Sequence, residues 1–388
     1  MRESMAMSSG STGHRQELAG LLATKGITGP RWIQAVAAVP RDLFLGEAVF
    51  HPDAGAEGIL WRPIRRDRTS SGEWLRMAHE DRTWVTQVDG IMAEDATQAL
   101  SGAPTSSSTL PSLVVTMLER ARIADGDRVL EIGTGTGYST ALLCERLGSG
   151  QVTSVECDPA VAARARTALE TAGHTPALTV GDGLTVHDRD AEYDRLIATC
   201  SVRYIPACWI WQVRGGGTIT APLSGWLGGT VLAHLTVGSD GTAGGRFLAD
   251  SLSFMFARPH DRPSRAHYLL NIGEQPGTRI SPAVLDDPAA RFVAQLGAPS
   301  AEKLGTGDHV VLLDVATGSQ ATTEPAPDGG WRVRQHGPLR LWDAVEDAIS
   351  TWREAGSPPV PAFGLAVTRE GQRVWLGCPD GPSWQLPA

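Results

Sequence analysis

Glycines alternate with threonines in one stretch of the chain, residues 129–138, which reads Val-Leu-Glu-Ile-Gly-Thr-Gly-Thr-Gly-Tyr. Its apolar start predicts a buried strand. The glycines predict a tight turn whose backbone a ligand can approach, because no Cβ atoms stand in the way. The predicted ligand contacts are Gly133, Thr134, Gly135, Thr136, Gly137 and Tyr138. A strand, a glycine turn and a helix in this order are typical of a cofactor site.

The spacing of the glycines and the acid before them favour one cofactor over another. A dinucleotide places its pyrophosphate at the N-terminus of the helix that follows such a turn, where an anion is favoured. This chain instead has the spacing Gly-x-Gly-x-Gly, and Glu131 stands just before it. A cationic sulfonium cofactor carries no phosphate and tolerates a nearby carboxylate. We therefore expect S-adenosyl-L-methionine, with S-adenosyl-L-homocysteine as its product, and we count Glu131 among its contacts.

Two further acids follow at the ends of the next predicted strands. Glu156 ends the second strand, where a carboxylate can accept both hydroxyls of a ribose. Asp182 follows the third strand and is placed to meet the adenine amino group, and Gly183 and Leu184 continue that turn. Each acid taken singly is more often a solvated surface or capping residue. Because all three acids lie at one rim of the predicted sheet, the set favours a cofactor site.

Short apolar strands alternate with helical segments beyond residue 126, which predicts a parallel sheet with crossover helices. The predicted strands are residues 128–132, 152–156, 177–180, 195–199 and 218–220. Two more apolar runs, 230–237 and 252–256, could close the sheet. Asp158 and Pro159 predict the start of a helix. The expected fold class is α/β and Rossmann-like, as in S-adenosylmethionine-dependent methyltransferases, with N-terminal helices and a C-terminal α+β extension.

Changes in composition divide the chain into three predicted parts. They are a helical lead-in at residues 1–80, an S-adenosylmethionine-binding catalytic domain at 81–258 and an accessory α+β module at 259–388. Residues 50–80 mix Arg, Gly and Pro with isolated Trp, and no structure is predicted for them. Residues 102–108 are a turn-forming run of Gly, Pro, Ser and Thr ahead of a helix that begins near Pro111.

The composition excludes several classes of partner. A net charge of −9 disfavours nucleic acid, because neutralising phosphates takes clustered Lys and Arg. No stretch reaches the ~20 apolar residues that a membrane span requires. The five cysteines show no C-x-x-C spacing, so neither a zinc site nor a redox pair is expected. We expect a cytoplasmic protein without a nucleic-acid, membrane or metal partner.

Several separate motifs resemble the protein-L-isoaspartate O-methyltransferase family. They are the glycine loop with Glu156, Gly181-Asp182-Gly183, Tyr193-Asp194, Ile205-Pro206, Gly215-Gly216-Gly217, Gly26-Ile27 and the segment from Val39 to Phe44. The resemblance runs from Leu18 to Leu223. It implies an enzyme that transfers a methyl group from S-adenosyl-L-methionine to a side-chain carboxylate of a protein or peptide bearing aspartate or isoaspartate.

In that family a Thr-Ile-Ser-x-Pro segment lies over the methyl-transfer centre. The matching residues here are Ser107, Ser108, Thr109, Leu110 and Pro111, so the family's hydroxyl position falls on Thr109 and Ser107 replaces the threonine. The resemblance implies that Ser107, Ser108 and Thr109 orient the acceptor carboxylate. The alternative is that this run simply caps the following helix. No general base is required, because a carboxylate with a pKa of about 4 is already ionised at neutral pH.

Two features resemble one branch of the family, which is found with ribosomal peptides such as lanthipeptides and graspetides. They are the Ser-rich residues 106–109 and the long C-terminal part. Members of that branch methylate an ordinary aspartate of a macrocyclised precursor and yield an aspartimide. The resemblance implies the same reaction for this chain. Three alternatives stay open, namely isoaspartate repair on damaged proteins, a cofactor-binding protein without turnover and a small-molecule carboxyl methyltransferase.

Overall fold

The structure is a computed structural model. It describes residues 2–55, 58–185, 192–264, 273, 277–278, 280–305, 307, 309–327 and 329–387, with side chains from residue 11 onward. The chain forms two compact units, Met1–Thr199 and Cys200–Ala388. The predicted boundaries near residues 80 and 258 fall inside these units and stay predictions. In the described part of the chain, no helix combines the length and the apolar character needed to cross a membrane.

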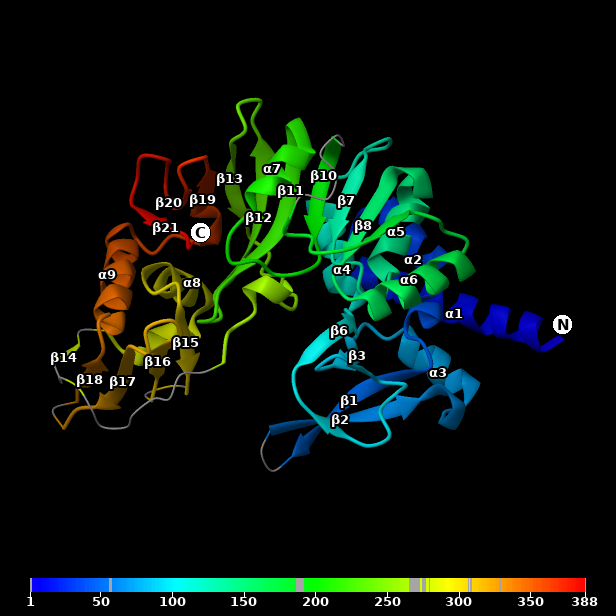
Figure 1. The fold of residues 1–388 in the computed structure, drawn as a ribbon, viewed down its shortest axis with the longest axis horizontal. Coiled ribbons are helices and arrows are strands. Elements are labelled where there is room, and N and C mark those ends of the chain that lie inside the picture. The colour runs from blue at the N-terminus through cyan, green and yellow to red at the C-terminus, as the bar shows by residue number, and fades with distance from the viewer. Residues whose placement is uncertain are drawn as a thin grey trace. The chain divides into compact units, whose positions relative to one another are not determined.

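The first unit contains four parallel strands in the order β10-β7-β8-β9 (Figure 1). They are β7 (Val129–Ile132), β8 (Val152–Glu156), β9 (Ala177–Val180) and β10 (Tyr193–Ala198). The first four of the five predicted strands are thus confirmed, with ends that differ by at most two residues. Every residue of β7 is buried, as expected for a central parallel strand that is covered on both faces.

Helices precede and connect these strands at the predicted places. α4 (Pro111–Arg120) leads into β7, α5 (Tyr138–Leu147) and the 3₁₀ turn η3 (Ser149–Gln151) connect β7 to β8, and α6 (Pro159–Thr171) connects β8 to β9. The predicted cap of α6 is confirmed, because Asp158 Oδ1 accepts hydrogen bonds from the backbone N–H groups of Ala160 at 2.9 Å and Val161 at 3.2 Å. Beyond the end of this helix, Gly173 has a φ of 85°, which suits a glycine after a helix terminus.

Two helices and a short turn precede the parallel strands, as the sequence predicted. They are α1 (Arg2–Thr24), α2 (Pro30–Ala38) and the 3₁₀ turn η1 (Arg41–Phe44). The apolar positions Leu18 and Leu22 of α1 and Trp32 and Val36 of α2 are buried. The helices therefore bury most of their apolar positions, whereas Leu21, which the sequence also indicated as part of the apolar face of the first helix, is exposed.

Residues 48–108 form an antiparallel sheet, in the order β4-β3-β1-β2-β5 with β6 beside β3. Its elements are β1 (Ala48–Gly55), β2 (Gly58–Arg65), η2 (Arg66–Arg68), α3 (Ser71–Ala78), β3 (Trp84–Val88), β4 (Ile91–Met92), β5 (Leu100–Ser101) and β6 (Pro104–Ser108). The isolated tryptophans Trp61, Trp74 and Trp84 are buried in its two clusters. The predicted turn at 102–108 is wrong over most of its length, because β6 pairs with β3, for example Ser107 with Val85.

The second unit holds two antiparallel sheets, β21-β20-β19-β13-β12-β11 and β14-β18-β17-β16-β15. Its strands are β11 (Val213–Ser224), β12 (Thr230–Val237), β13 (Ala243–Leu248), β14 (Gly277–Thr278), β15 (Ala301–Leu304), β16 (Val311–Asp314), β17 (Gln320–Pro325), β18 (Trp331–His336), β19 (Phe363–Val367), β20 (Gln372–Leu376) and β21 (Ser383–Gln385). Its helices and turns are α7 (Ala207–Gln212), η4 (Arg258–His260), η5 (Pro282–Asp286), α8 (Pro288–Gly297), α9 (Leu341–Glu354) and η6 (Val360–Ala362).

The outcome of the predictions in this unit is mixed. The predicted strand at 230–237 is β12, and the strand predicted at 218–220 lies within the longer β11. The strand expected at 252–256 is wrong, because of those residues only Phe256 forms a bridge, to Ser201. Besides β11, β12 pairs with β13. The sequence did not predict β13, because its two glycines leave it without a continuous apolar run.

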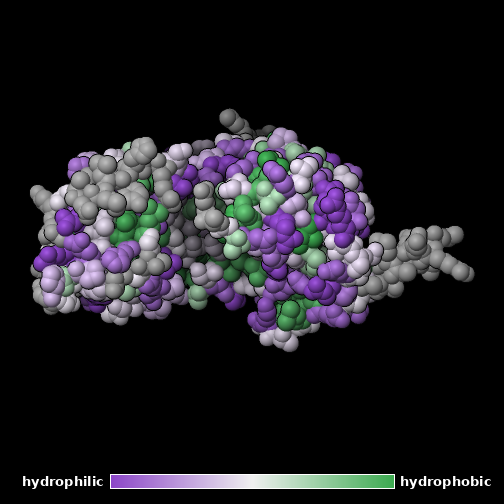
Figure 2. All heavy atoms as spheres, turned by 90° about the horizontal axis from the view of Figure 1, so that it is seen from below, coloured by the Kyte–Doolittle hydropathy of each residue, from purple (hydrophilic) through white to green (hydrophobic). Residues whose placement is uncertain are grey.

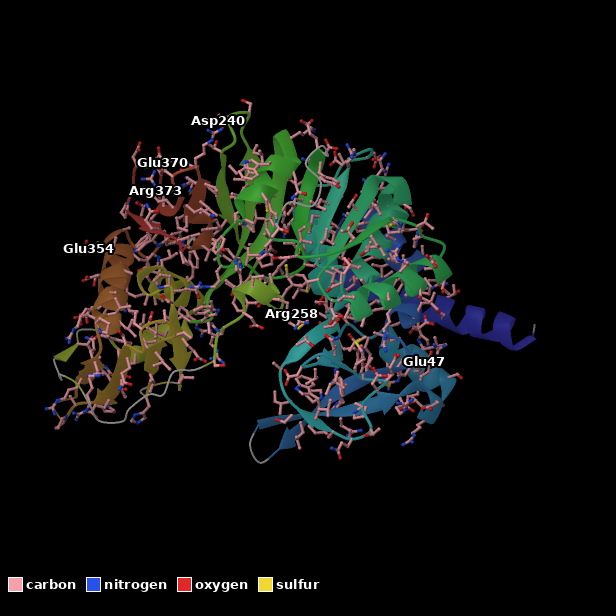
Figure 3. The ribbon with its side chains drawn as sticks, viewed as in Figure 1. Glu47, Asp240, Arg258, Glu354, Glu370 and Arg373 are labelled. Atoms are coloured by element: carbon pink, nitrogen blue, oxygen red, sulfur yellow. The ribbon has the colours of Figure 1, made fainter. Side chains whose placement is uncertain are left out.

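The surface carries no broad apolar area on the face that Figure 2 draws. Hydrophilic residues cover most of the described surface there, and hydrophobic residues form separate small patches. Polar residues also occupy strand ends in the second unit, where Asp240, Glu370 and Arg373 lie at the tips of the hairpins (Figure 3). Scattered apolar residues of this kind are normal on the surface of folded proteins and do not by themselves indicate an interface.

Candidate functional site

The chain leaves β7 through a turn that only glycines can form without strain. Gly133, Gly135 and Gly137 have φ values of 99°, 54° and 90°. A Cβ atom on Gly133 would also lie 2.8 Å from Thr199 Oγ1, at the end of β10. The predicted glycine loop is therefore a tight backbone turn at the carboxyl end of the parallel strands, and α5 begins directly after it.

Glu156 lies at the same edge and binds the loop. Its Oε2 atom accepts a hydrogen bond from Gly135 N at 2.8 Å, and its Oε1 atom accepts one from Asp158 N at 3.0 Å. The residue is 8% exposed. A carboxylate offers about four lone-pair sites; Cys157 Sγ adds a weak bond to Oε1 at 3.5 Å, and Oε2 still has a site for a hydroxyl group. Glu156 thus fits the predicted role of a ribose ligand.

Glu131 has very different surroundings. It is 0% exposed, and its carboxylate accepts hydrogen bonds from three hydroxyls, those of Ser139 at 2.5 Å, Thr140 at 2.5 Å and Ser154 at 2.7 Å. Burial raises the pKa of Glu131 above its ordinary value, although the three hydroxyls act in the opposite direction. This carboxylate ties the first turn of α5 to β8, and its predicted contact with the cofactor stays a prediction.

The remaining predicted residues of the loop lie in three kinds of environment. Thr134 is buried, with its Oγ1 atom 2.6 Å from Ser154 Oγ. Thr136 lines a cavity. The Tyr138 ring is buried against Phe44, with ring centroids 5.9 Å apart, and burial raises the pKa of its phenol to about 12. Its hydroxyl has no hydrogen-bond partner among the described residues.

The turn after β9 lies close to the end of β7. A Cβ atom on Gly183 would be 2.5 Å from Ile132 Cγ2, so this turn requires glycine. Asp182 is exposed, and its Oδ1 atom accepts a hydrogen bond from Leu184 N at 2.9 Å. The strand ends that carry Glu131, Glu156 and Asp182 therefore share one edge, as the parallel topology predicted.

We call Ser107, Ser108 and Thr109 the hydroxyl segment. Its first two residues end β6, and Ser108 is buried while Ser107 and Thr109 are half-buried. The alternative role as a helix cap is wrong. The N-cap position of α4 is Leu110, without a side-chain bond, and the carboxylate of Asp81 accepts from Ser112 N at 2.8 Å instead.

The hydroxyl segment passes directly over the glycine loop. The carbonyl oxygen of Ser107 lies 3.7 Å from the position that a Cβ atom on Gly135 would occupy. These residues are far apart in the sequence, and the folded chain brings them together. The predicted catalytic residues and the predicted cofactor loop are therefore neighbours in space.

A cavity of about 580 Å³ adjoins this edge. Ser106, Gly135 and Thr136 contribute to its wall, which also includes apolar residues such as Leu45, Met92 and Ala160. Two ion pairs form among the residues that line this cavity, one between Arg66 and Glu47 at 3.5 Å and one between Arg164 and Glu94. Glu47 stands next to the start of β1 (Figure 3). A space of this size is in the range of ligand sites.

Sequence reasoning missed two residues of this region. Thr199 donates from Oγ1 to the carbonyls of Ile132 and Gly133 and so fastens the start of the loop. Arg41 binds the hydroxyl segment through its guanidinium. Thr199 has no local signal, because a threonine at a strand end is an ordinary pattern. Arg41 lies in the segment from Val39 to Phe44 that resembles the family, but that motif does not indicate which residues its side chain binds. Within the described ranges, no three His, Cys, Asp or Glu side chains gather to hold a metal ion.

Comparisons with known proteins agree with the motifs. The model of the Protein-L-isoaspartate(D-aspartate) O-methyltransferase family matches residues 76–236. Protein-L-isoaspartate O-methyltransferase 1 of Anaeromyxobacter sp. (strain Fw109-5) is 32% identical over 227 residues, which are 58% of this chain and 87% of the relative. The protein-L-isoaspartate O-methyltransferase of Koribacter versatilis (strain Ellin345) is 31% identical over 224 residues, 56% of this chain and 82% of the relative.

A solved structure of a protein-L-isoaspartate O-methyltransferase has the same fold. It aligns with 94% of this chain and 100% of its own chain, at a TM-score of 0.53 and 18% identity. The Rossmann-like α/β fold class is therefore confirmed. Because the alignment reaches over nearly the whole chain, the long C-terminal part does not distinguish this chain from proteins of that description.

Proposed function

The chain belongs to the protein-L-isoaspartate O-methyltransferase family, and we propose that it methylates the side-chain carboxylate of an aspartyl residue held against the hydroxyl segment. It is an S-adenosyl-L-methionine-dependent carboxyl O-methyltransferase. The observation that carries the proposal is the close approach of Ser107 to Gly135, because it joins the acceptor residues to the cofactor loop. Methyl transfer requires donor and acceptor in one line.

The chain's own residues have distinct tasks in this proposal. Glu156 and the Asp182 turn bind the ribose and adenine, and the glycine loop lets the cofactor lie against the backbone. When bound, the cofactor supplies an electrophilic methyl group, which forms a bond to the acceptor oxygen as its bond to sulfur breaks. Ser107 and Thr109 donate hydrogen bonds that orient the acceptor carboxylate. No side chain has to remove a proton, since the acceptor is already ionised.

For the acceptor itself we propose an ordinary aspartate of a macrocyclic ribosomal peptide, whose ester is attacked by the next backbone nitrogen to give an aspartimide and methanol. The support is the departure of the hydroxyl segment from the family pattern, with Ser107 in place of threonine and Leu110 after Thr109. The length of the chain gives no support, since a structure of a protein-L-isoaspartate O-methyltransferase covers the same extent.

Repair of isoaspartate in damaged proteins is the second candidate. It is favoured by the relative from Anaeromyxobacter, 87% of which aligns with this chain at 32% identity. The two candidates share the cofactor site and the hydroxyl segment. They differ in the substrate and in the carboxylate that accepts the methyl group. This is the α-carboxylate in isoaspartate and the β-carboxylate in aspartate.

A comparison of three substrates decides between them. The enzyme and cofactor are incubated with a macrocyclised Asp-containing precursor, its linear form and an isoaspartyl peptide, and each product is followed by mass spectrometry. The proposal predicts a methyl gain on the macrocycle, followed by loss of methanol. Turnover of the isoaspartyl peptide alone contradicts the tailoring role and selects repair. Binding of S-adenosyl-L-homocysteine without turnover of any substrate selects a cofactor-binding protein.

The role of the hydroxyl segment is tested by Thr109→Ala. We expect kcat on the accepted peptide to fall by about 100-fold, which is typical of losing one positioned hydrogen-bond donor. Thr97→Ala, at an exposed position, is the matched control. Unchanged kcat in Thr109→Ala removes that residue from the mechanism.

A further inference from the structure

Arg41 is a fully buried arginine whose guanidinium binds oxygen atoms of the chain itself. It is 0% exposed and follows α2 in the short turn η1. Burial lowers the pKa of Arg41 to about 10, so the group stays charged at neutral pH. A buried charge is costly unless hydrogen bonds satisfy it. Its partners therefore show which parts of the chain this charge holds together.

Its hydrogen bonds reach two segments that are far apart in the sequence. On one side the guanidinium donates to three carbonyls of the turn after α3, those of Ala78 at 2.9 Å, Glu80 at 2.7 Å and Arg82 at 2.8 Å. On the other side it donates to Ser108 O at 3.0 Å, Thr109 O at 3.2 Å and Ser108 Oγ at 3.2 Å. One side chain thus joins residues 78–82 to the hydroxyl segment.

The same guanidinium also touches the first residue of α5. Its Cζ atom lies 5.6 Å from the centroid of the Tyr138 ring, which follows the glycine loop directly. Cation–aromatic contacts at this distance are attractive. Arg41 therefore contacts both the backbone of the hydroxyl segment and the helix that the cofactor loop opens.

We propose that Arg41 is a positioning residue for methyl transfer, which fixes the backbone at Ser108 and Thr109 so that the hydroxyls point at the acceptor. This inference rests on the proposed function, because that function makes the hydroxyl segment the acceptor site. Arginine is required since its planar fork supplies five donors in a fixed geometry. Lysine has three donors on a single nitrogen and can serve one of the two segments but not both.

Two further bonds run from the turn that Arg41 holds to the residues directly after the hydroxyl segment. Thr83 Oγ1 accepts from Leu110 N at 3.0 Å, and Asp81 Oδ1 accepts from Ser112 N at 2.8 Å. Residues 78–83 thus form a platform for the hydroxyl segment, and Arg41 binds both. Thr83 is exposed, so its side chain can be changed with little risk to folding.

The test is Arg41→Lys in the full chain, with Arg68→Lys as the control. Arg68 is exposed in η2 and belongs to neither of the two segments that Arg41 joins. For each variant, calorimetry with S-adenosyl-L-homocysteine gives the affinity and the fraction of competent protein. The kcat on the accepted peptide is then divided by that fraction, so that unfolded protein does not count as lost activity.

We expect kcat per competent molecule to fall by about 10-fold or more in Arg41→Lys, as small misplacements near reacting groups do, with cofactor affinity within about 2-fold of the wild type. Arg68→Lys should keep both values. A purely structural role predicts a smaller competent fraction with unchanged kcat per competent molecule. That result overturns the proposal.

A second variant covers the case in which Arg41→Lys does not fold. Thr83→Val removes the bond to Leu110, directly after the segment, and we expect kcat to fall by about 2-fold to 3-fold while cofactor affinity is unchanged. Unchanged kcat in a folded Thr83→Val, together with an Arg41→Lys that does not fold, overturns the proposal.

Hydrogen exchange separates this inference from the proposed function. Exchange at the amides of residues 106–110 should be faster in Arg41→Lys or in Thr83→Val than in the wild type. If the wild type methylates no aspartyl or isoaspartyl peptide, the proposed function fails, and exchange still decides whether the platform holds the segment. Unchanged exchange in every folded variant shows that it does not.

Discussion

Two adjacent strands of the parallel sheet, β7 and β8, each carry a glutamate at the cofactor edge, in opposite surroundings. Glu131 belongs to the interior, where three hydroxyls of α5 and β8 bind its carboxylate. Glu156 lies at the rim, where backbone N–H groups occupy part of its carboxylate and leave lone pairs for a ligand. The difference shows that an acid near a glycine loop can stabilise the fold of the loop or bind its ligand. The hydrogen-bond partners of its carboxylate determine which of these two roles it has.

The largest effect on cofactor affinity should come from Glu156, the glutamate at the rim. In Glu156→Ala, the hydrogen bonding of the ribose to a carboxylate is lost, and we expect the affinity for S-adenosyl-L-homocysteine to fall by about 100-fold. Calorimetry measures it. Glu170→Ala, at an exposed position of α6, is the control and should bind as the wild type does. Near-normal affinity in Glu156→Ala would show that the two glutamates do not differ in the way described.

The interior glutamate should affect stability more than binding. In Glu131→Gln the hydroxyls of Ser139, Thr140 and Ser154 lose a charged acceptor but can rotate towards a neutral amide. We expect the free energy of unfolding to fall by about 1–2 kcal/mol, measured with urea. The cofactor affinity of the folded variant should stay within about 3-fold of the wild type. A large loss of affinity with unchanged stability would reverse the assignment of the two acids.

The pH dependence of stability sharpens the contrast further. Because burial raises the pKa of Glu131 in the folded protein, the folded state binds this proton more tightly than the unfolded state, whose group titrates near 4.5. The contribution of Glu131 to stability is therefore fully present below pH 4.5 and is lost as the pH rises towards the folded pKa. The stability deficit of Glu131→Gln should accordingly shrink as the pH is raised from 4.5. A deficit that grows with pH would contradict the raised pKa.

The smallest effect concerns the tyrosine that follows the loop. The Tyr138 hydroxyl is buried without a hydrogen-bond partner among the described residues, and such a group costs about 1 kcal/mol or more. Tyr138→Phe keeps the ring under Arg41 and removes the unsatisfied oxygen. We expect a higher melting temperature, which thermal unfolding measures. A lower melting temperature would mean that the hydroxyl has a bound water as its partner.

The cofactor edge was largely predictable from the sequence. The strands β7, β8, β9 and β10 and the cap of α6 follow from patterns only a few residues long, because apolar runs, glycine and Asp-Pro act on the backbone locally. The common edge of Glu131, Glu156 and Asp182 follows from topology, since parallel strands with crossover helices bring their carboxyl ends together. The glycine turn likewise carries its own signal, because few other residues adopt its φ values.

Only the tertiary structure decided what the polar residues of this edge bind. The sequence placed the hydroxyl segment in a turn or a helix cap, whereas β3 makes it a strand and Arg41, 67 residues away from Ser108, fixes its backbone. It likewise placed Glu131 with the cofactor, and its three hydroxyl partners come from α5 and β8. Backbone conformation reflects neighbours in sequence, but the state of a buried polar group depends on partners in space, and those are supplied by distant parts of the chain.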